Sequence, residues 1–342
     1  MRILYIGSTE SSACASYYAD AAEQLGHEVH RWNPHLWAST TPWEKLHQRF
    51  THRPAARALT TAHEQLIDQV KTLKIDLVMN IAENFIPLQT LKEIKSLASK
   101  APRLMYHSHD NNFAPGILKP DDFFDSLAVY DCVFTTKSQN LPRYKMLGQP
   151  YSFFIPSAFE PKYHRPILSG ESRLGNKQFP ISFVGTYDRS RDRFLEAVQW
   201  DQLYVWGDRW NRFSKYRKYR DHIVPHAVYF PDFADIMSHS EIALGLLREE
   251  AEDRHTQRTF EIPACGAFQL APRNDEILSF FDEDREIVCF QSLEELQDKV
   301  AFYLRHPTLR QQIAQAGHVK VMQSQHSYLD RVKTMLTKLS QC

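Results

Sequence analysis

The chain has 342 residues, enough for about two globular domains, and its 43% hydrophobic and 24% charged residues exclude a disordered or fibrous protein. Its 41 basic residues balance its 41 acidic ones, so it lacks the net positive field that drives general nucleic-acid binding. The 11 glycines form neither a dinucleotide-binding fingerprint nor a P-loop, and the five scattered cysteines predict no disulfide framework and no structural zinc site.

The first 150 residues alternate between short apolar runs and amphipathic stretches. The apolar runs predict strands at 2–6, 27–32, 77–81, 104–106 and 132–135. The amphipathic stretches predict helices over 13–25, 55–71 and 88–99. Gly7 ends the first strand and Gly26 ends the first helix. Because strands that are joined by helices run parallel, this half predicts a doubly wound α/β sheet.

Turn-forming and polar residues cluster between 148 and 177, which predicts a domain boundary. The pattern then resumes, with strands at 181–184, 203–206, 242–247 and 267–270 and helices at 192–200, 293–304, 307–316 and 327–339. We expect domains over 1–165 and 166–325 and a terminal helix over 326–342. The predicted fold is two Rossmann-like domains facing across a cleft, with a terminal helix that can cross back to the first domain.

The segment 248–266, REEAEDRHTQRTFEIPACG, is the densest group of chemically active residues. It enters a helix near Arg258, and the helix amino end together with this guanidinium suits a phosphate. Glu261 lies in the first turns of the helix, where a carboxylate suits the paired hydroxyls of a ribose. The same residues also fit a solvated, salt-bridged helix start in which Glu261 is a capping group.

Residues 258–266, followed by a short strand and by EELQDKVAFYLRHPTLRQQIAQAG, resemble the carboxyl-terminal domain of CgeB-like (spore-maturation-type) glycosyltransferases. These belong with the retaining two-domain enzymes of the GT-B fold, and the resemblance covers 242–319 most strongly. It implies that Glu261 binds the donor ribose. It also implies that Asp253, whose side chain is shorter than this group's pattern at that position, faces the transferred sugar.

The resemblance extends to the loop that follows the strand at 181–184. This strand ends at Gly185, and the arginines after it resemble the basic residues that hold the donor diphosphate in such enzymes. Of Arg189, Arg191 and Arg193, the first and last are the preferred pair. Fixed cations and helix amides would stabilise the charge on a leaving nucleoside diphosphate without a metal. Loop arginines are also common as plain surface residues.

The segment 104–112, LMYHSHDNN, places His109 and Asp110 just past a strand in the first half. Related enzymes often carry a His or Asp here that faces the sugar from the acceptor side, and we expect this role for both residues. A metal site is the weaker alternative, since imidazole and carboxylate also bind zinc. Glu83 and Asn84 form a second candidate pair, and Gly7 would let the backbone pass close to a ligand.

The segment 208–221, DRWNRFSKYRKYRD, interleaves six basic residues with four aromatic ones. Such a segment could bind a base, a glycan or an anionic lipid surface. A solvated helix whose aromatic side chains pack on the core is the favoured interpretation.

The sequence therefore predicts a metal-independent, retaining, hexosyltransferase-like glycosyltransferase without a cofactor. Its partners would be a nucleotide diphosphate sugar and an unidentified glycan, protein or small-molecule acceptor. A nucleotide-sugar epimerase and a non-catalytic sugar-nucleotide-binding or scaffold protein are the alternatives. No signal-type or membrane-spanning apolar run is evident, which predicts a cytoplasmic protein with peripheral membrane contact at most.

Overall fold

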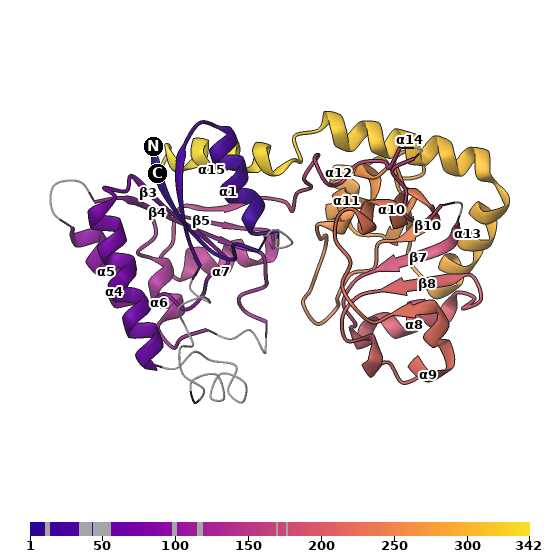
Figure 1. Ribbon diagram of the computed structural model, residues 1–342, viewed down its shortest axis with the longest axis horizontal. Coiled ribbons are helices and arrows are strands. Elements are labelled where there is room, and N and C mark those ends of the chain that lie inside the picture. Colours follow the sequence, from indigo (N-terminus) through magenta and orange to yellow (C-terminus); the bar gives the residue numbers. More distant parts are fainter. Residues whose placement is uncertain are drawn as a thin grey trace. The chain divides into compact units, whose positions relative to one another are not determined.

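The computed structural model describes residues 1–10, 14–33, 43, 56–97, 101–114, 119–168, 170–175 and 177–342. The chain forms two compact units (Figure 1). Unit 1 comprises Met1–Pro156 and Tyr328–Cys342, and unit 2 comprises Ser157–Ser327. Each unit is built on a parallel six-stranded sheet with interleaved helices, so the predicted two-domain α/β architecture is confirmed.

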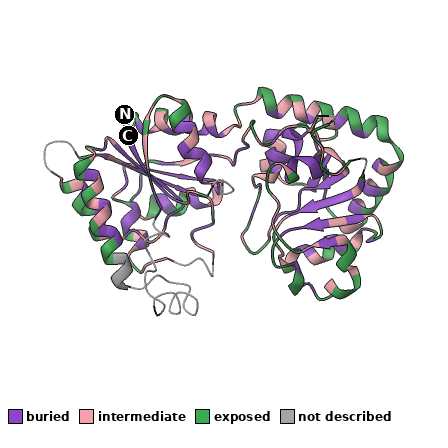
Figure 2. Cartoon of the chain, in the orientation of Figure 1, coloured by how far each residue is buried: buried purple, intermediate pink, exposed green. Residues whose placement is uncertain are grey.

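The sheet of unit 1 has the strand order β2-β1-β3-β4-β5-β6. Its strands are β1 (Arg2–Ile6), β2 (Glu28–Trp32), β3 (Leu77–Ile81), β4 (Arg103–Ser108), β5 (Cys132–Thr135) and β6 (Ser152–Phe154). The central strands are buried along most of their length (Figure 2) because helices cover both faces of a parallel sheet. The strand order reverses between β1 and β3, so the chain leaves their adjacent carboxyl ends in opposite directions.

The helices of unit 1 include one from the far end of the chain. They are α1 (Ser16–Gln24), α4 (Ala56–Thr72), α5 (Leu88–Ser96), α6 (Phe123–Leu127), α7 (Leu141–Met146) and α15 (Tyr328–Leu339). The ring of Tyr328 on α15 lies 5.1 Å from that of Tyr17 and 5.0 Å from that of Tyr18, both on α1. These aromatic contacts hold the terminal helix on the first unit, as the sequence predicted.

The sheet of unit 2 has the strand order β12-β11-β10-β7-β8-β9. Its strands are β7 (Phe179–Val184), β8 (Leu203–Trp206), β9 (Ile223–Val224), β10 (Ser240–Leu244), β11 (Gln269–Pro272) and β12 (Val288–Phe290). This is the strand order of dinucleotide-binding sheets, and it reverses between β7 and β10.

The helices of unit 2 connect these strands. They are α8 (Asp192–Ala197), α9 (Tyr216–Tyr219), α10 (Asp232–Ser238), α11 (Arg258–Ala264), α12 (Asp275–Phe280), α13 (Leu293–Arg305) and α14 (Pro307–Gln323). Side-chain caps define two helix starts. Asn274 accepts hydrogen bonds from the backbone amides of Glu276 and Ile277 at α12, and Ser292 accepts one from Glu295 at α13.

Several predicted boundaries in unit 2 were wrong. The strand expected at 242–247 is β10, which spans 240–244, and the helix expected at 192–200 is α8, which ends at residue 197. The strand expected at 267–270 is β11, which begins two residues later. The helix expected to end at residue 316 is α14, which continues through Gly317 to Gln323. A Cβ atom at residue 317 would lie 2.3 Å from the carbonyl oxygen of Glu286, so close packing requires glycine inside this helix.

No helix among the described residues is long and apolar enough to cross a membrane.

Candidate functional site

In unit 2, β7 and β10 end side by side where the strand order reverses, which is where open α/β sheets bind their ligands. Arg191 connects the two loops that leave these strands. Its Nη1 donates to the Thr186 carbonyl at 2.6 Å, and its Nη2 donates to the Leu246 carbonyl at 3.2 Å. Burial lowers the pKa of Arg191 to about 10, which still leaves the guanidinium charged at neutral pH. A buried cation is therefore fixed between the two loops at the reversal point of the sheet.

Arg258 and Glu261, both predicted from the sequence, meet at the end of β7. Arg258 donates from Nε to the Val184 carbonyl at 3.3 Å and from Nη1 to the Glu261 carboxylate. Its guanidinium lies 4.1 Å from the ring centre of Phe233. Glu261 is only 5% exposed. The pair is thus both a salt-bridged helix start and a positioned charge pair at the ligand-binding end of the sheet.

His164 is a third member of this cluster, and sequence reasoning missed it. Its Nδ1 accepts a hydrogen bond from the backbone amide of Glu160 at 2.9 Å, so Nε2 carries the proton. That Nε2 lies 3.4 Å from Oε1 of Glu261. Burial lowers the pKa of His164, while the carboxylate of Glu261 opposes this shift. Each oxygen of Glu261 thereby faces a different fixed group, Arg258 on one side and His164 on the other.

The other residues predicted for the diphosphate lie along the loop after β7. Arg189 and Arg193 are exposed, and Arg193 forms an ion pair with the exposed Glu249. The carbonyl of Gly185 accepts a hydrogen bond from Nε1 of Trp210 at 2.8 Å. The structure therefore separates the three arginines of this loop: Arg191 is buried and bonded to backbone, whereas Arg189 and Arg193 are exposed.

Asp253 lies in the loop between β10 and α11, and its carboxylate is buried. It accepts a hydrogen bond from Nε of Arg248 at 2.9 Å. The same loop is held at His255, whose Nε2 accepts from the backbone amide of Ser157 at 2.9 Å and whose Nδ1 lies 3.2 Å from Glu276. A role of Asp253 toward a sugar stays a prediction.

In unit 1, Gly7 follows β1 at the reversal point of the sheet. A Cβ atom there would lie 2.9 Å from the carbonyl oxygen of Ile81 at the end of β3. It would also lie 2.7 Å from Oη of Tyr5. Only glycine fits this close approach between the two strand ends, as expected for a position where backbone must pass close to a neighbour.

His109 follows β4 and belongs to a cluster of neutral rings. Its ring lies 4.7 Å from that of His107, and its Nδ1 lies 3.8 Å from Sγ of Cys14. Nε2 of His107 lies 2.9 Å from Oη of Tyr18. Burial lowers the pKa of His109 to about 4 and holds that of His107 well below its usual value, so both imidazoles are uncharged at neutral pH. A neutral imidazole can exchange hydrogen bonds with hydroxyl groups.

The remaining candidates in unit 1 differ in exposure. Asp110 is exposed, and its backbone carbonyl accepts a hydrogen bond from Ser108 Oγ at 2.9 Å. Glu83 is buried and accepts from the backbone amide of Phe85 at 2.8 Å. Asn84 accepts from Oη of Tyr106 at 2.6 Å. The second candidate pair therefore shapes its own loop and the neighbouring strand.

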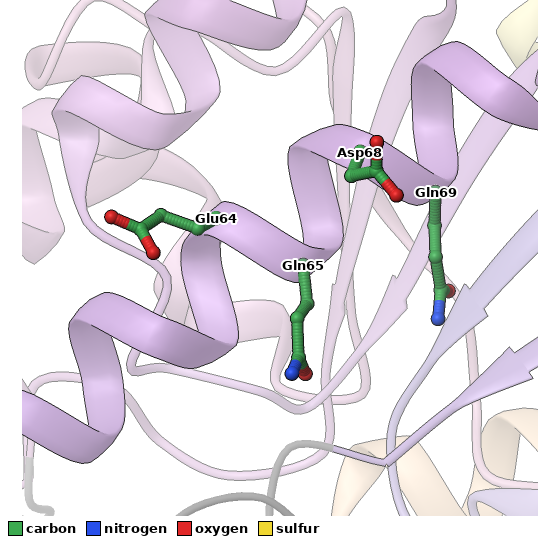
Figure 3. Close-up of a pocket in the computed structure, with 4 residues that line it drawn as sticks. All are labelled: Glu64, Gln65, Asp68 and Gln69. Carbon is green, nitrogen blue, oxygen red and sulfur yellow. The ribbon is translucent and has the colours of Figure 1, made fainter.

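A surface hollow of about 350 Å³ lies along α4, and none of the predicted site residues lines it. Glu64, Gln65, Asp68 and Gln69 line it (Figure 3). Two carboxylates without a cation in this lining would repel an anionic ligand. Within the ranges that the structure describes, no three His, Cys, Asp or Glu side chains gather in a way that could hold a metal ion.

The second half of the chain carries a sequence-level likeness to a known family. Residues 189–337 match the family described as glycosyl transferase-like. This range contains Arg189, Arg193, Asp253, Arg258 and Glu261. A comparison with curated protein sequences gives no match.

Solved structures share the fold over the whole chain. Sucrose-phosphate synthase from Thermosynechococcus elongatus is 14% identical with a TM-score of 0.71, covering 100% of this chain and 98% of the other. HepE from Anabaena in complex with UDP is 12% identical with a TM-score of 0.67, covering 100% of both chains. A putative UDP-N-acetylglucosamine 2-epimerase from Listeria monocytogenes is 11% identical with a TM-score of 0.57, covering 99% and 95%. The chain thus has the two-domain architecture of GT-B glycosyltransferases.

Proposed function

We propose that this protein is a glycosyltransferase that takes a sugar from a nucleotide diphosphate donor and passes it to an acceptor. The observation that carries the proposal is the position of Arg258 and Glu261. They form a charge pair at the reversal point of the second sheet, inside the region that matches the glycosyl transferase-like family. The CgeB-like resemblance of residues 242–319 supports the same assignment.

In this proposal Glu261 binds the ribose of the donor. A carboxylate has about four acceptor positions, so one contact each to Arg258 and His164 leaves positions for two ribose hydroxyls. Because Arg258 and His164 hold the carboxylate in place, little conformational freedom is lost when the nucleotide binds. Hydrogen bonds from hydroxyls to a fixed charge are among the stronger ones in proteins.

The diphosphate would be held by cations of the same unit. Arg258 contributes its charge at the end of β7, and Arg189 and Arg193 lie exposed on the loop that follows, where they can turn toward a phosphate. As the bond between sugar and diphosphate breaks, these charges stabilise the leaving group without a metal. Asp253 and the pair His109–Asp110 would contact the sugar, with retention of configuration as in the enzymes that the sequence resembles.

The UDP-bound state of HepE suggests a first set of ligands to test. Thermal unfolding should be recorded with UDP, GDP, dTDP and CDP, because a ligand that binds the native state raises the unfolding temperature. The Glu261→Ala variant should lose this shift and most turnover of the matching donor sugar. Glu294→Ala, an exposed glutamate on α13, is the matched control and should keep both. Undiminished turnover by Glu261→Ala would refute the assignment.

An epimerase is the second candidate, favoured by the similarity to the Listeria structure, although its TM-score is lower than those of the two structures above. An epimerase converts its nucleotide sugar without an acceptor, whereas a transferase needs one for efficient turnover. Incubation of the protein with the donor alone, followed by chromatography of the nucleotide sugar, separates the two. A non-catalytic sugar-nucleotide-binding protein would bind the nucleotide and turn over nothing in either assay.

A further inference from the structure

A dense group of cations lies between β8 and β9 of unit 2. The twelve residues from 209 to 220 include six basic residues and no acidic one, in a chain whose basic and acidic residues balance overall. All six side chains are exposed. We call them the basic surface: Arg209, Arg212, Lys215, Arg217, Lys218 and Arg220. They occupy α9 and its flanks at one edge of the unit (Figure 1), where Figure 2 shows mostly exposed ribbon.

The aromatic residues of the same segment face inward, as the sequence analysis favoured. Trp210 and Phe213 are buried in the core of unit 2. The ring of Tyr219 stacks on that of Trp200 with centroids 4.3 Å apart and planes 9° apart. These rings fix the backbone of the segment, so the cations project from a rigid platform.

Most of this charge is uncompensated within the protein. Lys215 pairs with Glu196 at 2.9 Å, and Arg220 lies 3.7 Å from Asp221. The other four cations, among the residues that the structure describes, have no carboxylate oxygen within 4.0 Å: Arg209, Arg212, Arg217 and Lys218. Like charges this close in sequence repel each other, and an external anionic partner would relieve that repulsion.

We propose that the basic surface docks the protein on a lipid bilayer that contains anionic headgroups. Clusters of four to eight Lys and Arg residues are attracted to such surfaces, because each cation adds to the binding free energy independently of exact geometry. The exposed cations are spread over α9 and its flanks, which suits a diffuse layer of charge. A single-stranded nucleic acid would use exposed aromatic side chains for stacking, whereas here Trp210 and Phe213 are buried and the half-buried Tyr216 and Tyr219 pack against the core.

Co-sedimentation of the full chain with vesicles tests this proposal. Vesicles of phosphatidylcholine with phosphatidylglycerol should bind the protein, and those of phosphatidylcholine alone should not. Each removed cation should cost about fivefold in partitioning, so R212Q/R217Q/K218Q should weaken it on the order of 100-fold. The control K162Q/R285Q/R305Q removes three exposed cations elsewhere on unit 2 and should change binding by less than about threefold.

Thermal unfolding of both triple variants should match the original protein, since all six substituted side chains are exposed. Equal loss of vesicle binding in both variants would overturn the proposal, because the attraction would then follow net charge alone. Absence of binding to phosphatidylglycerol vesicles would also overturn it, as would tight binding to single-stranded RNA without vesicle binding. Nucleotide binding by the Glu261 site is not involved, so these results are independent of the proposed function.

Discussion

The two sheets present different chemistry at the carboxyl ends of their strands. In unit 2 the strand ends carry charged groups, with buried Arg191 below and the pair of Arg258 and Glu261 at the end of β7. In unit 1 the corresponding end carries neutral imidazoles, His107 and His109, beside Tyr18. The same architecture thus supplies one end suited to an anion and one suited to hydroxyl groups.

This difference arises from burial as well as from residue type. His107 and His109 lose their charge because desolvation lowers their pKa values. Arg191 keeps its charge despite similar burial, because the pKa of a guanidinium starts far above neutrality and carbonyl oxygens accept its hydrogen bonds. In the proposed function this difference corresponds to a division of roles, in which unit 2 would bind the nucleotide and His109 and Asp110 of unit 1 would contact the sugar or acceptor.

The largest expected effect is a loss of nucleotide binding in unit 2 that has no counterpart when a residue of unit 1 is changed. Arg258→Met should weaken binding of the preferred nucleoside diphosphate about 100-fold, roughly 3 kcal/mol, because a charged contact to phosphate is lost. His109→Gln should leave this dissociation constant within about twofold while lowering sugar transfer. Isothermal titration calorimetry and a transfer assay measure the two quantities. If His109→Gln weakened nucleotide binding as much as Arg258→Met, the division between the units would be wrong.

The second prediction compares two arginines of one loop. Arg191→Met should lower the free energy of unfolding by about 2 kcal/mol, since it leaves the carbonyls of Thr186 and Leu246 without their charged donor. Arg193→Met should lower it by less than about 0.5 kcal/mol, because its ion pair with Glu249 is exposed. Urea unfolding measures both values. Equal values for the two variants would contradict the structural role assigned to Arg191.

The third prediction concerns the contact between His164 and Glu261. A glutamine amide can donate from nearly the position of Nε2, so His164→Gln should keep the donor KM within about threefold. His164→Asn is too short to reach Glu261 and should raise the KM about tenfold with little change in kcat, because ground-state and transition-state binding are lost together. If both variants had a raised donor KM and an equally lowered unfolding temperature, the role of this histidine would be purely structural.

The smallest expected effect is that of His109 on how the stability of the protein depends on pH. His109 has a pKa of about 4 in the folded chain, below its unfolded value of about 6.5. Between these values the unfolded state binds more protons, so the free energy of unfolding should fall as the pH drops from about 6.5 to 4. His109→Gln should reduce the slope of unfolding temperature against pH in this window. His226→Gln, which removes an exposed histidine, should leave that slope unchanged.

The sequence predicted the strands best where short apolar runs stand between turn-forming residues. The bounds of β3, β5 and β8 agree with the prediction, because each is a short and mostly buried run. The bounds of β11 differ because Ala267 and Phe268 are also buried, so apolarity alone does not set the pairing with β10. The helix α14 continues through Gly317, where the prediction ended it. The sequence did not reveal this because the glycine packs against residue 286, a contact between positions far apart in the chain.

The site shows the same limit. Local spacing was enough to place Arg258 beside Glu261 one helical turn away. It could not reveal His164, which reaches Glu261 from almost a hundred positions earlier in the chain. Nor could it tell which arginine after Gly185 turns inward, because Arg191 is fixed by carbonyls of two separate strand ends.

Because α15 belongs to unit 1, the chain makes its first unit from two stretches separated by all of unit 2. A ribosome therefore releases every residue of unit 2 before Tyr328 can meet Tyr17 and Tyr18. The later unit in the sequence can finish folding first, while α1 waits with an uncovered aromatic face. Unit 1, which comes first in the sequence, can therefore complete its fold only after unit 2 has been synthesised.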